Sequence, residues 1–250
     1  CVSVFRTDGK GSHIRPVGED ISKGQVVLQR DKVLGAPDIG LAASIGTATV
    51  RVRRRPVVAI VATGDELIGI KERPSRGKVV NSNSYTLSSA AREIGAEVKS
   101  FGIVGDSREQ LADTFRKALA CDMLITSAGV SVGDHDYVRA AFGDSGVRML
   151  FWKVAQRPGH PMTFGCKGSR PVFGLPGNPV SSLVSFILYV RPALLKMMGH
   201  KNLFMPVVRA RITHEIKTAR GLKEFVRCRL EEENGRFLAS STGTQSSGVL

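Results

Sequence analysis

The stretch VVAIVATGDEL, residues 57–67, decides the fold class of this chain. Its first six residues, Val57 to Ala62, are all apolar, which predicts a strand that is buried on both faces. The residues that follow, Thr63 to Glu66, are small or acidic and read as a loop at the end of that strand. Such a strand is typical of a parallel sheet that is covered by helices on both sides.

The region that follows repeats the order of strand and helix. Asn83 is placed to cap a helix at residues 84–94, and Asp106 is placed to cap another that ends near Ala118. Further strands are predicted at 96–104, 122–126, 148–155, 161–164 and 172–174, and a long apolar helix runs from Asn178 to about Met198. The repeated units predict an α/β fold with a parallel sheet and right-handed crossovers.

The two ends of the chain differ from this central region. Before it we predict a strand at 25–29, a helix at 37–45 that Gly46 stops, and a strand at 47–52. After it, strands at 207–212, 225–230 and 237–240 are separated by turns that include Asn234-Gly235. We therefore expect a partial mixed domain at 1–55, a three-layer α/β domain at 56–203, and the start of a small β-barrel domain at 204–250. Because the first residue is Cys1 rather than Met, and because Leu250 lies in the middle of what reads as a loop or helix start, we expect a chain truncated at both ends.

Composition narrows the classes of partner. The 36 Lys and Arg residues exceed the 22 Asp and Glu residues by 14, which favours anionic partners. No basic stripe studded with aromatic residues accompanies this charge, so nucleic acid is not expected. The longest apolar run, residues 183–190, is too short to span a bilayer and ends at Arg191-Pro192, so no membrane partner is expected. The four cysteines form no C-x-x-C pair, and we expect free thiols in a soluble cytoplasmic protein.

Carboxylates follow the predicted strands at the points where these strands end. In an open parallel sheet, ligands bind beyond the carboxyl ends of the strands. Three loops bring Asp65, Glu66, Asp106, Asp134 and Asp136 to that edge, beside the Gly- and Ser-rich segment at 127–133. Hard oxygen ligands beside free backbone N–H groups suit Mg²⁺ together with a phosphate. The alternative is that each carboxylate only caps a helix or closes a turn.

Two further motifs supply cations and a helix start. In KVAQRPGHP, residues 153–161, two prolines and a glycine fix the backbone, and Lys153, Arg157 and His160 are expected to face the carboxylates. Simple solvation of these cations at the surface is the alternative. In GLPGNPVSS, residues 174–182, Asn178 and Pro179 begin a helix whose N-terminus can bind an anion, although this is also an ordinary way to begin a helix.

Five motifs in this order resemble the molybdopterin molybdenumtransferase family, which includes the E domain of gephyrin. They are T-G-D-E-L, N-S-N at 81–83, G-V-S-V-G-D-x-D-Y ending at Tyr137, K-V-A-x-x-P-G-x-P and F-G-L-P-G-N-P-V-S-S. The earlier I-R-x-x-G-E-D-I at 14–21 is similar to a segment of the first domains of that family. The resemblance extends from about residue 14 to residue 250.

The resemblance implies an activity and partners. Members of the family place molybdate on the dithiolene of adenylated molybdopterin (molybdopterin-AMP) with Mg²⁺, release AMP and work as homodimers. A molybdopterin adenylyltransferase is then an expected partner enzyme. Two alternatives stay open: the chain is itself the adenylyltransferase, which shares the α/β domain, or it is a non-catalytic molybdopterin-binding scaffold of the gephyrin type. The P-G-H-P segment and the appended β region favour insertion of molybdenum.

The resemblance also implies roles for individual residues. Glu66, Asp106 and Asp136 match the acidic residues of the family's site and are the expected magnesium ligands, and Lys153 matches one of its cations; these four are the expected catalytic residues. Arg227 and Ser247 match residues associated with molybdate, and Ser181 lies in the helix-start motif. The other expected binding residues are Thr63, Gly64, Asp65, Ser127, Gly129, Ser131, Gly133, Pro158, His160 and Asn178.

Three positions depart from the family pattern. Ala128 stands where a second glycine is usual, His160 where lysine is usual, and Thr244 where histidine is common. The first departure bears on how closely the backbone approaches the pterin phosphate. The second bears on the strength of the anion site, because an imidazole changes its charge near neutral pH.

Overall fold

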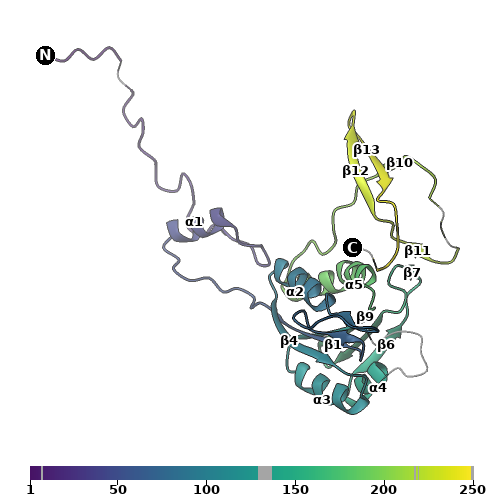
Figure 1. Ribbon diagram of the computed structural model, residues 1–250. Coiled ribbons are helices and arrows are strands. Elements are labelled where there is room, and N and C mark those ends of the chain that lie inside the picture. The colour runs from purple at the N-terminus through teal and green to yellow at the C-terminus, as the bar shows by residue number, and fades with distance from the viewer. Residues whose placement is uncertain (7, 129–136, 217, 219, 249–250) are drawn as a thin grey trace. The chain divides into compact units, whose positions relative to one another are not determined.

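The computed structural model describes residues 1–6, 8–128, 137–216, 218 and 220–248. Its chain divides into two compact units, Cys1–Val52 and Arg53–Leu250, which are described separately below (Figure 1). In the first unit the predicted helix is confirmed as α1, Ala36–Ser44, and Gly46 follows it with a φ of 74°. Asp38 holds its first turn by accepting a hydrogen bond from the backbone N–H of Gly35 at 3.0 Å.

The two strands that we predicted in the first unit are wrong. Residues 25–29 and 47–52 have no strand conformation. Val26 is 76% exposed and Val52 is 68% exposed, so the apolar residues that suggested these strands are not packed against a partner. A strand needs a neighbouring strand for its backbone hydrogen bonds, and the local pattern alone cannot show whether one is present.

A six-stranded sheet forms the centre of the second unit. Its strands lie in the order β4 (Glu97–Val104), β1 (Val57–Thr63), β5 (Met123–Ser127), β9 (Arg170–Leu175), β8 (Thr163–Lys167) and β6 (Arg148–Trp152). The first four strands are parallel, as predicted, while β8 runs antiparallel to both β9 and β6. The tight turn between β8 and β9 explains this reversal, because a short connection joins antiparallel strands. The sheet is therefore dominated by parallel strands, which confirms the α/β class.

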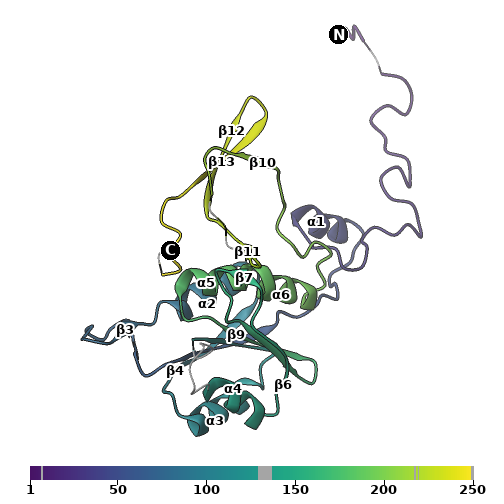
Figure 2. The ribbon, with the colours of Figure 1, turned by 90° about the vertical axis from the view of Figure 1, so that its right-hand side faces the viewer.

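Helices cover both faces of the sheet, as Figure 2 shows. On one face lie α2 (Asn83–Glu93) and a long helix made of α5 (Pro179–Ser185), the π-helical turn η1 (Phe186–Val190) and α6 (Arg191–Met197). On the other face lie α3 (Arg108–Ala118) and α4 (Tyr137–Asp144). The two buried clusters are centred on Ile60 with Phe186 and on Val61 with Phe115. Burial of each such side chain contributes roughly 1.5–3 kcal/mol.

The starts of α2 and α3 differ from our prediction. Ser107, not Asp106, caps α3, and its hydroxyl accepts a hydrogen bond from the N–H of Gln110. Asn83 is the first residue of α2 rather than its cap. The side chain of Asn81 instead accepts a hydrogen bond from the N–H of Ser84 at 3.2 Å. Asn83 and Asp106 are therefore available for other contacts.

The long helix continues beyond the apolar run that we noted at 183–190. Arg191 and Pro192 lie inside it, because Pro192 occupies an early position of α6 and needs no N–H partner there. By length and composition alone, Pro179–Met197 is long and apolar enough to cross a membrane. Half of it is buried in the protein, as in the core helix of a folded domain, so this is weak support for a membrane span.

The predicted strands of the C-terminal region form a small sheet with the order β10 (Ala210–Ile212), β13 (Arg236–Ser241) and β12 (Cys228–Glu233). Asn234 and Gly235 have φ values of 50° and 73°, which are the left-handed values of a two-residue hairpin turn. Two shorter pairs complete the structure: β2 (Leu67–Ile68) with β3 (Val79–Val80), and β7 (Gln156–Arg157) with β11 (Lys223–Glu224). The second pair joins the C-terminal region to the α/β domain.

Candidate active site

A cavity of about 400 Å³ lies beyond the carboxyl ends of β1, β5 and β9. We call it the Asn83 cavity; its polar lining residues are Glu66, Asn81, Ser82, Asn83, Ser127 and Asn178. Asn83 holds two of its walls together, since its Nδ2 donates to Ser127 Oγ at 2.9 Å and to the carbonyl oxygen of Gly177 at 2.7 Å. One buried amide thus connects α2, the end of β5 and the loop after β9.

Ala128 shows the consequence of its departure from the family pattern. Its φ is 75°, which is a left-handed conformation that glycine adopts without penalty. For alanine this conformation costs roughly 1–2 kcal/mol. Its Cβ also faces Gly177, where an added Cβ would lie 3.1 Å away. The cavity wall therefore accommodates the methyl group only because residue 177 is a glycine.

Three of the acidic residues predicted for this edge are described by the structure, and they lie in the loops after β1 and β4: Asp65, Glu66 and Asp106. Asp65 Oδ1 accepts from the N–H of Asp106 at 3.0 Å, and Asp106 Oδ2 accepts from the N–H of Asp65 at 3.4 Å. Lys78 Nζ also donates to the carbonyl oxygen of Asp65 at 2.6 Å. Asp65 and Asp106 thus fasten two loops together, while Glu66 is exposed and lines the Asn83 cavity.

Several residues predicted for this edge lie outside the described residues: Gly129, Ser131, Gly133, Asp134 and Asp136. At the end of β1, Thr63 is fully buried, and its hydroxyl has no hydrogen-bond partner in the described part of the chain. Gly64 follows with a φ of 138°, and the carboxylate of Glu66 occupies the space where a side chain at Gly64 would be. Among the described residues, no three His, Cys, Asp or Glu side chains are grouped closely enough to hold a metal ion.

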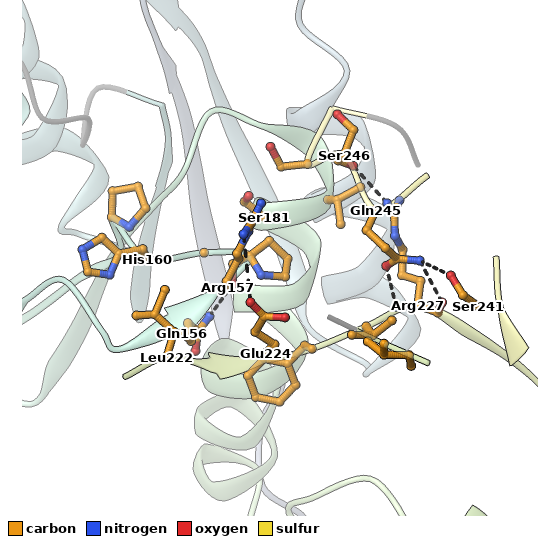
Figure 3. A pocket seen from close by; sticks show the side chains of 18 of the residues that line it. Gln156, Arg157, His160, Ser181, Leu222, Glu224, Arg227, Ser241, Gln245 and Ser246 are labelled. Carbon is orange, nitrogen blue, oxygen red and sulfur yellow. Dashed lines mark hydrogen bonds and ion pairs between the residues drawn. The ribbon is translucent and has the colours of Figure 1, made fainter. Parts of the chain in front are cut away.

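A second cavity, of about 930 Å³, lies between the 156–161 turn, the start of α5 and the C-terminal region (Figure 3). We call it the Arg227 cavity; its polar lining includes Arg157, His160, Ser181, His214, Glu224, Arg227 and Ser247. Pro161 lines both cavities. The structure thus places five predicted residues in the lining of one cavity, although they come from four separate stretches of sequence: Pro158, His160, Ser181, Arg227 and Ser247.

The loop at 242–247 is held in place by Arg227 and Asn178. Arg227 Nη2 donates to the carbonyl oxygens of Thr244 and Ser246 at 2.9 and 3.0 Å. Asn178 precedes α5 as its cap residue, but its side chain makes no capping bond; its Nδ2 donates to Ser247 Oγ at 3.0 Å. The N–H of Val180 donates to the carbonyl oxygen of Ser247 at 3.0 Å. The loop is therefore attached directly to the helix start.

The three cations of the KVAQRPGHP motif do not all point to this cavity. Arg157 and His160 line it, and Arg157 lies 4.0 Å from the carboxylate of Glu224. His160 Nδ1 lies 2.7 Å from the carbonyl oxygen of Val154, to which it donates. Lys153 lines neither cavity, and its Nζ lies 5.5 Å from the ring centre of Trp152. The structure therefore brings together two of these cations, and a catalytic role for Lys153 stays a prediction.

Two residues of the site were not among our predictions. Asn83 belongs to the N-S-N motif, but we read it as a helix cap. Gln156, which is 2% exposed, lies inside the KVAQRPGHP motif. Its amide contacts Pro158 and Tyr189. The sequence did contain one signal for Gln156, namely a polar amide inside a motif whose backbone is otherwise fixed by prolines and glycine. Its partners are distant in sequence or depend on the conformation of the turn.

Three sequence families match consecutive parts of the chain. The family described as "Probable molybdopterin binding domain" matches residues 59–196, which is more than half of the chain. The "MoeA N-terminal region (domain I and II)" matches residues 3–46, and the "MoeA C-terminal region (domain IV)" matches residues 209–250. The first match covers the sheet and its helices, and the third covers the small β sheet.

Individual relatives agree with these matches. The chain is 36% identical over 244 residues to molybdopterin molybdenumtransferase 2 of Mycobacterium tuberculosis, covering 95% of this chain and 60% of that protein. It is 33% identical over 234 residues to the molybdopterin molybdenumtransferase of Staphylococcus epidermidis, covering 93% of this chain and 56% of the relative. A crystal structure of a molybdopterin biosynthesis moea protein from Pyrococcus horikosii superposes with a TM-score of 0.78 at 29% identity, over 91% of this chain and 55% of that one.

The fold and the family matches define an α/β protein of the "Probable molybdopterin binding domain" class, with appended segments at both ends of that domain. The chain belongs to the molybdopterin molybdenumtransferase family. It spans about 56% to 60% of the length of the curated relatives described above.

Proposed function

We propose that this chain acts in the insertion of molybdenum: it transfers molybdate to the dithiolene of adenylated molybdopterin, and AMP is released. The observation that carries the proposal is that Arg157, His160 and Arg227 line one cavity together with two serines, next to a second polar cavity. Guanidinium donors suit a tetrahedral oxyanion. The names of the relatives support the same activity.

We assign the oxyanion to the Arg227 cavity and the adenylated pterin to the Asn83 cavity. In the first, Arg227 and Arg157 supply positive charge, while the hydroxyls of Ser181 and Ser247 are further donors. In the second, backbone and side-chain groups near Ser127 and Asn178 surround a space large enough for part of the nucleotide. Pro161 lies at the junction of the two cavities, so the two substrates would meet there.

Magnesium is a separate part of the proposal. The described residues do not form a complete magnesium site, because Asp65 and Asp106 accept each other's backbone N–H and, of these three carboxylates, only Glu66 lines a cavity. Asp136, the third ligand that we predicted, lies outside the described residues. Carboxylates are the ligands that Mg²⁺ prefers, and a titration of wild type and Glu66→Gln with Mg²⁺ by calorimetry tests the assignment.

The test of the function is a release assay with this chain. The chain is incubated with adenylated molybdopterin, and AMP is measured by chromatography with and without molybdate. We expect AMP only when molybdate is present, with loss of the product in Arg227→Ala. Equal release without molybdate, or no release together with no binding of molybdate, would contradict the proposal.

The same assay separates the two alternatives. An adenylyltransferase would form adenylated molybdopterin from molybdopterin and ATP, and a scaffold would bind the pterin without turnover. We favour insertion because the Arg227 cavity depends on the C-terminal region, which the α/β domain alone lacks. Homodimer formation, a molybdopterin adenylyltransferase partner and a cytoplasmic location belong to the same proposal; sedimentation and fractionation test the first and last of these.

A further inference from the structure

The turn that presents Arg157 and His160 is closed at its base by two hydrogen bonds. The N–H of Val154 donates to the carbonyl oxygen of His160 at 3.0 Å, and His160 Nδ1 donates to the carbonyl oxygen of Val154 at 2.7 Å. These contacts fix the shape of the turn. The backbone pair between β7 and β11 attaches the turn to the C-terminal region. A separate contact is needed to attach it to the long helix.

Gln156 supplies that contact from inside the turn. Its Nε2 donates to the carbonyl oxygen of Pro158 at 3.0 Å, and its Oε1 accepts from the hydroxyl of Tyr189 at 2.5 Å. The orientation of the amide is determined, because a proline carbonyl only accepts and must therefore face the nitrogen. Burial raises the pKa of the Tyr189 hydroxyl, so this hydroxyl stays protonated and donates throughout the neutral range.

The long helix offers one face to the turn. Ser181, Ser185 and Tyr189 follow one another at intervals of four residues, which places them along one side of a helix. A Cβ added to Gly159 would lie 2.6 Å from both Gln156 Nε2 and Ser185 Oγ. The turn is therefore packed against this face without spare room. Tyr189 lies in the π-helical turn η1, a type of distortion that is often found at functional sites.

We propose that Gln156 and Tyr189 are positioning residues that set the place of Arg157 and His160 in the Arg227 cavity. The proposal rests on the proposed function, because it takes this cavity as the oxyanion site. Neither residue needs to touch the oxyanion: Gln156 lines the cavity, but its amide holds protein partners at both ends, and Tyr189 does not line the cavity. They act through the turn between them and the two cations.

The test uses Tyr189→Phe, which keeps the ring and removes the donor, and Gln156→Met, which keeps the length and removes both polar ends. Tyr85→Phe is the matched control, since Tyr85 lies on α2, is 53% exposed and lines neither cavity. The first measurement is ¹⁵N NMR of the His160 imidazole, assigned with His160→Gln. We expect the protonated Nδ1 signal of the wild type and of Tyr85→Phe to weaken or shift in Tyr189→Phe and Gln156→Met.

The second measurement is calorimetric titration with molybdate. Loss of one hydrogen bond predicts affinity that is weaker by about 2- to 12-fold in each variant, and the double variant should be no weaker than the weaker single variant. Gly159→Ala, whose added Cβ would press on Gln156 Nε2 and Ser185 Oγ, should act in the same direction and replaces any variant that fails to fold. Unchanged His160 signals together with unchanged molybdate affinity would overturn the proposal, even if the melting temperature fell. If wild type binds no molybdate, the proposed function fails, while the His160 signals still test the positioning.

Discussion

Asn83 allows a sharp test of how the candidate site is built. In Asn83→Asp the shape is kept, but an oxygen replaces the nitrogen that donates to Ser127 Oγ and to the carbonyl oxygen of Gly177. The hydroxyl of Ser127 can rotate and become the donor, so that contact survives. The carbonyl oxygen of Gly177, 2.7 Å from the former donor, cannot adapt and is left facing a carboxylate.

The expected loss follows from these two contacts. A buried acceptor that loses its donor costs about 1–3 kcal/mol, and more when a charge is involved. We therefore expect the free energy of unfolding to fall by roughly 2–3 kcal/mol. With a urea dependence of about 2–3 kcal/mol per molar, this loss lowers the midpoint of urea unfolding by about 1 M. The midpoint is measured by circular dichroism at neutral pH.

Asn81→Asp is the matched control, with the same chemical change two residues away. Asn81 Oδ1 already accepts from the N–H of Ser84, and the Ser84 hydroxyl can turn to donate to the new oxygen. A carboxylate is also favoured at the N-terminal end of a helix. We expect no loss of stability in this variant. If both variants lower the midpoint equally, the reasoning from Asn83 to the carbonyl oxygen of Gly177 is wrong.

Two further predictions concern single side chains. Arg227→Ala should weaken molybdate binding at least tenfold, through loss of a charged donor and of its bonds to the 244–246 loop, and leave binding of the adenylated pterin unchanged; calorimetry that finds equal losses would point to misfolding. The pKa of Asp122 is lowered, first by the hydrogen bond from the Arg54 guanidinium and also by the backbone N–H of Val57. Its contribution is therefore present above the unfolded pKa of about 3.9 and is lost as pH falls through the lower folded value; Asp122→Asn should flatten the acid branch of a stability–pH curve, and parallel curves would exclude this.

The sequence predicted the central sheet better than it predicted the N-terminal strands and the helix caps. Val57 to Ala62 has no polar residue, so only a strand covered on both faces accommodates it, and β1 confirms this. The strands at 25–29 and 47–52 were wrong because short apolar patterns carry no information about a partner strand. The caps were misplaced by one or two residues, since Ser107 and Asp106 are both suitable and only tertiary contacts choose between them.

The candidate site was predicted in part for a similar reason. Arg227, Ser181 and Ser247 lie in motifs, so their residue types could be assigned before their positions were known. The contacts of Gln156 with Tyr189 and of Asn83 with Ser127 and Gly177 join residues 33 to 94 positions apart, and no local pattern contains those pairs. Lys153 has the charge that we expected of a site residue. Its backbone, however, has a left-handed φ of 68°, and its side chain lies near Trp152 rather than in the lining of either cavity.

The attachment of the C-terminal region has a consequence for exchange with solvent. Within the described part of the chain, few backbone donors cross the joint: the N–H groups of Lys223 and Phe225 donate to Ala155 and Arg157, and that of Val180 donates to Ser247. Because so few hydrogen bonds hold this joint, it opens at a much lower free energy than the central sheet does. The amides of the sheet exchange only through larger unfolding. Deuterium uptake at Val180, Lys223 and Phe225 therefore reports how often the Arg227 cavity comes apart while the sheet beneath it stays folded.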